Sequence, residues 1–500
     1  MRQVLLTGSA LYLLALHVQG QQVARFDTVQ FNQVGSFALG QSIFELDSGY
    51  LCFSLQKGLP GLSQDIFSLR FNGGGGLEAQ RTFQTYQQDY PGYNSATISD
   101  DGSFYSGMSR GLVIGPLDSL LLYKYGPNGD TLWTRFVAVD TAFAMRGTAM
   151  TQTGDVLLTG IHYPGWVNGG NEAFLYRLDS LGAVKSFHGY ANFDGTDVIE
   201  GMDGSLFVCG VGNVLSNNYR GILVRSDTLG NELWRSTSSG YVSYFHLIPL
   251  RDEAVLTLGT IGNGIDGNHS LASKFDTAGI ELWHKELLQS DENSRASIFH
   301  AGYEAVDSSL VVCGWIRRSD TLTKGTVVKL DKDGTVLWTR LYSHYVVQSI
   351  SLEQIFWDVK PTRDGGMVLT GEANNSTYPY GQLWLLKLDS AGCLVPGCGS
   401  VGVQEFVDDL NKHLRVWPNP ASDVLQISLA LPEGAEVHGG VRAMLLDGTG
   451  RVVQEQPVRQ NLNVLNANLD VSALPAGTYY LHVRDGKRWL AGSKVVVTAP

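Results

Sequence analysis

Short apolar runs separated by turn signals recur along most of this chain, at a spacing of about fifty residues. Each run follows a turn signal and usually closes with Gly; the seven runs end at Ser54, Gly107, Gly160, Gly210, Gly259, Gly314 and Gly371. Further along each unit come a basic residue, usually an apolar residue, an Asp or another turn-former, two variable positions and a Gly. These second motifs begin at Arg70, Lys124, Arg177, Arg225, Lys274, Lys329 and Lys387. A repeated strand-turn-strand unit of this length is typical of a propeller or a repeat array.

The sixth unit shows how one repeat divides into strands. Residues 298–306 and 309–314 read as two strands joined by a tight hairpin, and residues 326–330 and 335–341 read as a third and fourth strand around a turn. Four antiparallel strands in sequence make one propeller blade. Seven units therefore predict an all-β chain with a seven-bladed β-propeller at residues 23–398.

The seventh unit lacks a fourth strand, because residues 383–389 lead into Cys393-Leu394-Val395-Pro396 where that strand should begin. The segment Val23-Ala24-Arg25-Phe26 resembles the fourth strand of the second unit, residues 133–136. We therefore expect the N-terminal segment to supply the missing strand and close the ring, which removes exposed sheet edges.

The five cysteines fall into two groups. Cys393 and Cys398 flank a turn sequence that can bring their Cα atoms within bridging range, so we predict a disulfide between them. Cys52, Cys209 and Cys313 lie near the ends of equivalent apolar strands and are expected to be buried free thiols.

Two residue types of the repeat have structural interpretations. Trp133, Trp234, Trp283 and Trp338 each follow a turn Gly by four positions and are expected to fill the gaps between adjacent blades. The basic residue of each unit is expected to pair with the Asp two positions further on, on the same strand face.

Turn lengths distinguish the two faces of the predicted disk. The first-to-second and third-to-fourth strand connections are short, whereas the other connections are long and emerge on the opposite face, called here the long-loop face. Its loops are rich in aromatic residues, and the candidate binding residues are Tyr90, Tyr93, Tyr163, Trp166, Tyr378 and Tyr380. Such loops suit contact with a glycan or a protein. Loops stabilised by their own aromatic packing are the alternative.

Composition and the N-terminal sequence indicate the class of protein and the compartment in which it acts. A chain with 43% hydrophobic and 17% charged residues folds, and its 59 glycines fit many short strands with tight turns. The formal charge of −12 argues against nucleic acid as a partner. Arg2, an apolar run to Val18 and a small Gly20 predict a signal peptide at residues 1–20. A single membrane anchor is the alternative, but the run falls short of the about 20 residues that span a bilayer, so we expect no transmembrane anchor in the mature chain.

A different pattern begins after a linker at residues 399–413. Short alternating strands within residues 414–500 predict a small Ig-like β-sandwich. Four motifs there, at residues 417–421, 446–453, 474–480 and 494–497, resemble the sorting domain of type IX secretion substrates of the Bacteroidota. The matching positions include Pro418, Asn419, Pro420, Asp447, Gly450, Gly477 and Tyr479.

The resemblance implies that the type IX secretion machinery of the outer membrane reads this domain and removes it. The protein would then be attached to the cell surface or released. A generic Ig-like adhesion module is the alternative.

Catalytic patterns are weak in this chain. Residues 107–111 match G-x-S-x-G, but no helical pattern follows as a nucleophile elbow requires. Asp331 to Gly334 lacks the later ligands of a calcium loop and reads as a β-turn, which leaves only weak calcium binding open. The eleven histidines form no zinc-ligand spacing. We therefore assign no catalytic residue, metal or cofactor.

The spacing from Asp331 to Trp338 is similar to the repeat of quinoprotein-like propellers. Those enzymes commonly have a vicinal disulfide and eight blades, whereas this chain has no adjacent Cys pair and seven units.

The leading hypothesis is a secreted or cell-surface binding or adhesion protein that recognises a glycan or protein through the long-loop face. The alternatives are a secreted polysaccharide-acting hydrolase or lyase, and a quinoprotein-like propeller enzyme.

Overall fold

The computed structural model describes residues 25–30, 37–57, 64–83, 88–111, 117–139, 142–163, 171–212, 219–262, 268–288, 294–318, 323–344, 353–374, 381–394, 410–431, 437, 440–448, 450–461, 463–486 and 488–498. Within them the regular structure is β-strand, apart from one short 3-10 helix at Leu410–His413. No helix among these residues is long and apolar enough to cross a membrane.

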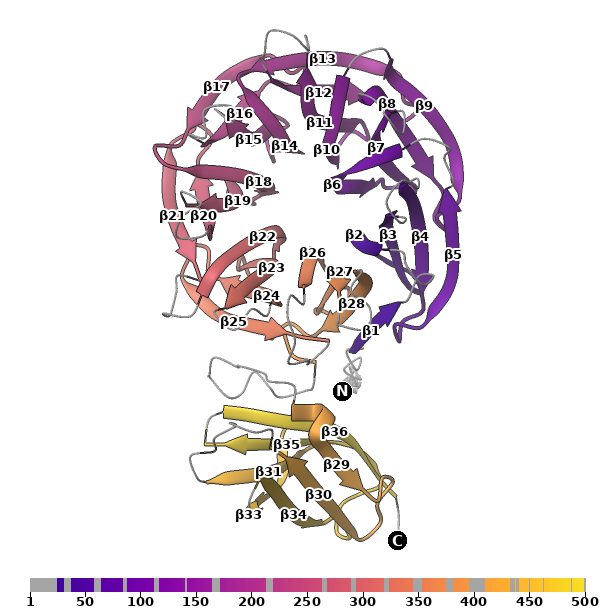
Figure 1. The fold of residues 1–500 in the computed structure, drawn as a ribbon, viewed down its shortest axis with the longest axis vertical. Helices are drawn as coiled ribbons and strands as arrows, with labels where there is room; N and C mark the ends of the chain where they lie inside the picture. The colour runs from indigo at the N-terminus through magenta and orange to yellow at the C-terminus, as the bar shows by residue number, and fades with distance from the viewer. Residues whose placement is uncertain are drawn as a thin grey trace, which may run out of the picture.

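Seven four-stranded antiparallel blades surround a common centre, each with its first strand innermost (Figure 1). The first three blades are β2 (Phe37–Leu46), β3 (Gly49–Lys57), β4 (Gln64–Phe71) and β5 (Leu77–Phe83); β6 (Gln88–Ile98), β7 (Phe104–Gly111), β8 (Leu117–Tyr125) and β9 (Thr131–Val139); and β10 (Ala142–Met150), β11 (Val156–Tyr163), β12 (Glu172–Leu178) and β13 (Val184–Ala191). One parallel pair, Gly147 with Asn94, links the inner strands of the second and third blades.

The remaining blades repeat the same plan. They are β14 (Phe193–Glu200), β15 (Leu206–Gly212), β16 (Arg220–Ser226) and β17 (Glu232–Thr237); β18 (Val242–Pro249), β19 (Val255–Ile261), β20 (His269–Phe275) and β21 (Glu281–Leu287); β22 (Ser294–Glu304), β23 (Leu310–Arg318), β24 (Thr323–Leu330) and β25 (Val336–Tyr342); and β26 (Gln354–Pro361), β27 (Met367–Ala373) and β28 (Gln382–Leu388) with β1 (Phe26–Gln30). The predicted seven-bladed all-β architecture is confirmed.

The N-terminal strand closes the ring, as predicted. β1 pairs antiparallel with β28, from Phe26 opposite Lys387 to Gln30 opposite Leu383. We expected this strand to include residues 23–26, whereas β1 begins at Phe26. Residues 23 and 24 lie outside the described residues. β1 therefore gives the seventh blade its fourth strand and covers the edge of β28.

Tryptophan and glycine of neighbouring units fit together, which explains the motif. A Cβ added to Gly334 would lie 3.1 Å from Cζ3 of Trp283, and one added to Gly182 would lie 3.1 Å from Cη2 of Trp133. Gly279 and Gly392 stand in the same way against Trp234 and Trp338, and all four glycines have a φ between 73° and 83°. Each Trp therefore packs between adjacent blades as predicted, against the turn of the next blade, where only Gly fits.

The expected pairing of the basic residues is wrong. Arg177 Nε lies 2.7 Å from Asp155 Oδ2, in the hairpin between the first two strands, and not beside Asp179. The same contact recurs as Lys124–Asp101, Arg225–Asp203, Lys274–Asp252, Lys329–Asp307 and Lys387–Asp364.

The Asp two positions on is occupied by its own turn. Asp179 Oδ1 accepts the backbone N–H groups of Leu181 and Ala183, and Asp227, Asp276, Asp331 and Asp389 accept the corresponding pairs. An Asp that caps a turn in this way has its carboxylate turned toward the turn's own amides.

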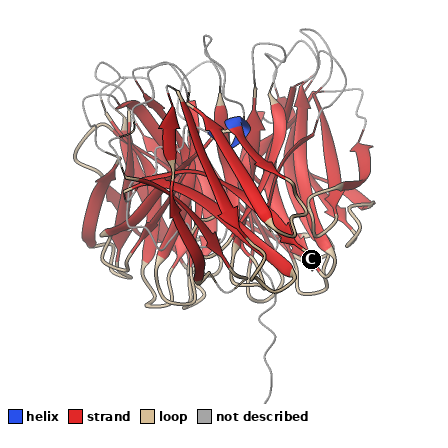
Figure 2. Cartoon of the chain, turned by 90° about the horizontal axis from the view of Figure 1, so that it is seen from below, coloured by secondary structure: helices blue, strands red, loops and turns tan. Residues whose placement is uncertain are grey.

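The short hairpins gather on one face of the disk, where Figure 2 shows a row of tan turns. They join the first strand to the second in every blade and the third to the fourth in the first six, for example β14 to β15 and β16 to β17. Because the strands are antiparallel, the other connections leave from the opposite face, as predicted. Most residues of those connections lie outside the described residues.

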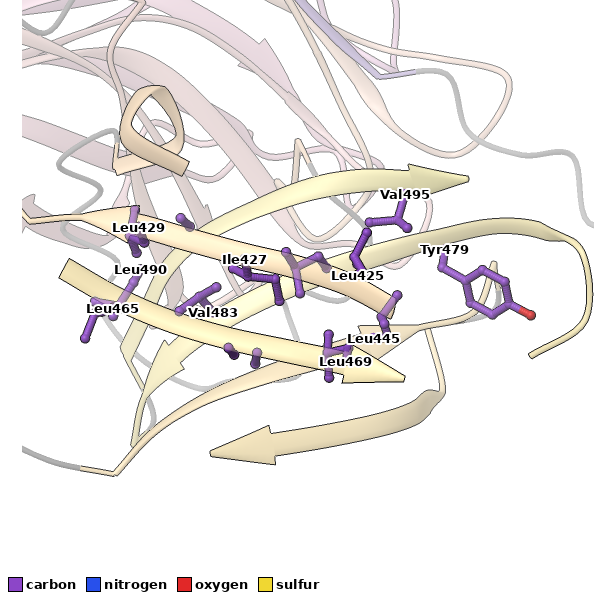
Figure 3. Close-up of a cluster of buried hydrophobic side chains, with 14 of the residues drawn as sticks. Leu425, Ile427, Leu429, Leu445, Leu465, Leu469, Tyr479, Val483, Leu490 and Val495 are labelled. Atoms are coloured by element: carbon purple, nitrogen blue, oxygen red, sulfur yellow. The ribbon is translucent and has the colours of Figure 1, made fainter. Parts of the chain in front are cut away.

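The C-terminal module consists of two four-stranded sheets that share one apolar core. One sheet orders β29 (Leu414–Trp417), β30 (Val424–Ala430), β34 (Val464–Asp470) and β33 (Arg459–Asn461), and the other orders β32 (Val452–Pro457), β31 (Val441–Leu446), β35 (Gly477–Asp485) and β36 (Arg488–Val497). Leu425, Leu445, Leu465 and Val495 are fully buried between the sheets (Figure 3). The predicted small sandwich is confirmed.

Candidate functional site

The six predicted binding aromatics are only partly described. Tyr163 is exposed at the end of β11, on the long-loop face. Tyr90 and Tyr93 lie in β6, but their side chains are outside the described residues, as are Trp166, Tyr378 and Tyr380 entirely. Their grouping into one surface therefore stays a prediction.

A polar patch surrounds Tyr163 on the third and fourth blades. Asn171 Nδ2 donates a hydrogen bond to Asp194 Oδ1 at 2.8 Å. Burial raises the pKa of Asp194, against the opposing effects of Asn171 and the positive Arg146. Burial and the charge of Asp194 raise the pKa of Tyr163. The charges of Asp194 and Arg146 thus act on the Tyr163 phenol, and Asn171 is bonded to Asp194; we call Arg146, Tyr163, Asn171 and Asp194 the polar patch.

A β-bulge recurs in the inner strands, which are the strands nearest the centre of the ring (Figure 1). The pairing register shifts between Gly40 and Ser42, Met145 and Gly147, Gly195 and Asp197, Tyr244 and His246, Phe299 and Ala301, and Phe356 and Asp358. Each bulge leaves one residue out of the ladder and redirects its side chain, which is why bulges often lie beside functional sites. Arg146, His300 and Trp357 are such residues, and sequence reasoning missed them because a bulge has no clear sequence signal.

Two aspartates next to these bulges join neighbouring blades. Asp197 Oδ2 accepts the Leu247 N–H at 2.9 Å, and Asp358 Oδ2 accepts the Ile43 N–H at 3.0 Å. Both carboxylates are buried. They satisfy amides of the next inner strand, so their first role is to hold the ring together.

A cavity of about 280 Å³ lies among the inner strands, between these aspartates and the short-turn face. Its charged side chains are matched: His246 Nδ1 lies 2.7 Å from Asp197 Oδ2, and Lys360 Nζ lies 2.9 Å from Asp358 Oδ1. In the part of the chain that the structure describes, no three ligand-type side chains gather to hold a metal ion. The two acidic and two basic side chains named here, all in the cavity lining, therefore already have partners.

A second cluster lies at the inner edge of the sixth and seventh blades. The His300 imidazole and the Trp357 indole stack with ring centroids 4.2 Å apart. Burial, together with the positive charge of His246, lowers the pKa of His300 to about 3. Burial and the charge of Glu353 raise the pKa of Glu372 to about 8, while the Trp357 indole opposes that rise. Both groups are therefore uncharged at neutral pH.

The residues of the catalytic and metal motif matches make structural contacts. Ser109 of the G-x-S-x-G match is buried within β7, and its Oγ accepts the Met145 N–H at 2.6 Å. Asp331 accepts two amides of its own β-turn. Cys52, Cys209 and Cys313 are buried free thiols. Cys398 lies outside the described residues, so the bridge to Cys393 stays a prediction.

Residues of the sorting motifs make hydrogen bonds and turns within the C-terminal module. Asn419 Nδ2 donates to the Lys494 carbonyl, and its Oδ1 accepts the Val496 N–H, each at 2.9 Å. Asp447 and Gly450 close a turn in which Gly450 has a φ of 83°. Tyr479 Oη donates to the Pro475 carbonyl at 2.8 Å, two positions before Gly477 opens β35. Pro418 and Pro420 flank Asn419 in the segment that the Asn419 bonds fix to β36.

Closed blades and an appended two-sheet module define a β-propeller protein with a C-terminal accessory domain. Residues 415–498 match the family described as secretion system C-terminal sorting domain. This domain directs type IX secretion across the outer membrane, to the cell surface or the exterior. The exact domain boundaries and the signal peptide at residues 1–20 stay predictions.

Solved structures with a similar chain path include several propellers. The β-propeller domain of the Trilobed protease from Pyrococcus furiosus is 11% identical with a TM-score of 0.42, covering 70% of this chain and 93% of that chain. The Dos1 propeller is 10% identical with a TM-score of 0.41, covering 74% and 91%. A protein of unknown function from Bacteroides caccae is 12% identical with a TM-score of 0.38, covering 62% and 94%. A search of curated proteins finds no match.

Proposed function

We propose that this chain is a secreted or cell-surface binding protein whose propeller recognises a glycan or a protein through its long-loop face. The observation that carries the proposal is the polar patch, where an exposed phenol lies beside a guanidinium, an amide and a carboxyl. Aromatic and Arg side chains dominate binding energy at recognition surfaces, and amide and carboxyl groups supply direction.

The arrangement of the patch on the scaffold supports this role. Arg146, Tyr163 and Asp194 belong to β10, β11 and β14, so they come from two rigid blades. The sorting domain takes the chain to the cell surface or exterior, where glycans and proteins of other cells are the available ligands. A positioned patch on rigid strands binds with little ordering cost.

Glycan-array and pull-down binding with the secreted protein tests the proposal. We expect Tyr163→Ala to weaken binding of the identified ligand by about tenfold or more, because one exposed aromatic often contributes this much to an interface. Leu229→Ala is the control, since Leu229 is also an exposed apolar side chain, 60% against 36% for Tyr163, but lies in a turn of the short-turn face. An equal loss in both variants, or none in either, would contradict the assignment of the face.

A second candidate function is a polysaccharide-acting hydrolase or lyase, and Glu372 is the observation that favours it. A carboxyl whose pKa is raised to about 8 keeps its proton at neutral pH, as a general acid must. Release of reducing or unsaturated ends from polysaccharides, abolished in Glu372→Gln, would favour the enzyme. Nothing in the described residues favours the quinoprotein-like alternative.

A further inference from the structure

Glu372, Trp357 and His300 lie together where the sixth and seventh blades meet the centre of the ring. We propose that these three side chains form a binding site for an uncharged sugar ring. The inference rests on the proposed function but concerns a site distinct from the polar patch, and it narrows the ligand from a glycan or protein to a neutral glycan.

The aromatic part of the site is the Trp357 indole, which is half-buried. Its ring is held at 34° to the His300 imidazole, with the centroids 4.2 Å apart. Trp357 is the bulged residue of β26 and His300 that of β22, so both rings are carried by the inner strands of adjacent blades. An aromatic wall with a few placed polar groups is the usual composition of a small-molecule site.

Two polar atoms beside that wall have no hydrogen-bond partner among the described residues. They are Glu372 Oε2 and His300 Nε2, and both atoms are buried. Only 3% of the Glu372 surface is exposed. Buried polar atoms are nearly always paired, and leaving one unpaired costs free energy. Ligand hydroxyl groups would satisfy both atoms.

The charge of the site selects a neutral ligand. Burial holds the Glu372 carboxyl protonated and the His300 imidazole neutral, so neither presents a full charge to a ligand. The two charged groups that act on these pKa values have partners of opposite charge, because Glu353 pairs with Arg317 and His246 pairs with Asp197. A sugar hydroxyl can donate to one group and accept from another. A uronate carboxylate would lose its hydration here without gaining a cation.

Titration of the secreted full chain by calorimetry and tryptophan fluorescence tests the site. The probes are maltose, cellobiose and mannobiose, with glucuronate as a charged counterpart. We expect at least one neutral disaccharide to bind and His300→Phe to weaken its binding by about tenfold, because the ring remains while one hydrogen bond is lost. His284→Phe is the matched control, since His284 is exposed on the outer strand β21.

Trp357→Phe, which keeps an aromatic ring but loses the indole N–H, provides a second variant if His300→Phe does not fold, and it should also weaken binding. Neutral-sugar binding that neither variant changes would overturn the site while leaving the proposed function standing. Binding of glucuronate alone, or of a protein partner alone, would also overturn the inference but not the proposed function. If neither a sugar nor a protein partner binds, both the proposed site and the proposed function are overturned.

Discussion

Single glycines decide how closely neighbouring blades approach. Gly334 has a φ of 83°, and an added Cβ would lie 3.0 Å from Lys285 Cγ and 3.1 Å from Trp283 Cζ3. Gly365 has a similar φ of 79° with nothing within 4 Å of an added Cβ. Both positions therefore require a positive φ, but only Gly334 also lacks room for a side chain.

Replacing these two glycines separates the two effects. We expect Gly365→Ala to lower the free energy of unfolding by about 1 kcal/mol from backbone strain. Gly334→Ala should lower it by about 1 to 3 kcal/mol more, because Trp283 must also move. Denaturant unfolding followed by tryptophan fluorescence measures both. Equal losses would mean that the Trp–Gly contact does not stabilise the ring.

The ionisation of Glu372 predicts a pH dependence of stability. Its pKa is raised from 4.5 in the unfolded chain to about 8 in the folded protein, so the folded state holds the proton more tightly. This group's contribution is therefore most favourable below about pH 4.5 and is lost progressively as the pH rises to about 8.

Glu372→Gln removes that titration, so wild type should lose stability relative to the variant between pH 5 and pH 8. We expect the relative loss to exceed about 1.4 kcal/mol, the equivalent of one pKa unit. Urea denaturation at the two pH values measures it. Parallel pH profiles for the two proteins would show that Glu372 ionises normally in the fold.

At the scale of elements, the closing strand β1 is anchored by one aspartate. Asp27 Oδ1 accepts the Trp384 Nε1–H at 2.8 Å and lies 2.7 Å from His344 Nδ1. Asp27→Ala would leave the Trp384 N–H, in an otherwise buried side chain, without this acceptor, at a cost of about 1 to 3 kcal/mol.

Hydrogen exchange should locate that loss at the seam. We expect faster exchange of the β1 and β28 amides in Asp27→Ala, with the other blades unchanged. Asp47→Ala is the control, because the Asp47 carboxylate is 97% exposed in its pair with Arg363. Uniform loss of protection around the ring would contradict a local role for Asp27.

The elements were more predictable from the sequence than the contacts between them. Strand alternation and turn glycines are local signals, so the blades and the closing strand could be recognised. The partner of Arg177 could not, because Asp155 reaches it through the pairing of β11 with β12 while the nearer Asp179 caps its own turn. The site could be predicted even less, because His300 and Trp357 lie at bulges in two different blades and Glu372 lies on the strand next to Trp357.

At the scale of the whole molecule, the sorting domain and the propeller have separable tasks. Deletion of residues 414–500 should leave the propeller inside the native host, because the match at residues 415–498 is the sorting signal. Cell fractionation and protease accessibility of intact cells measure this. A truncated chain that still reached the surface would contradict the role of the domain.

The central claim is that the long-loop face of the secreted propeller holds the ligand. Hydrogen exchange of the full chain, with and without the ligand identified on the array, tests it most directly. We expect slowed exchange around Arg146 in the middle of β10 and Tyr163 at the long-loop end of β11, and no change in the short hairpins such as that between β14 and β15. Protection confined to the short hairpins would contradict it.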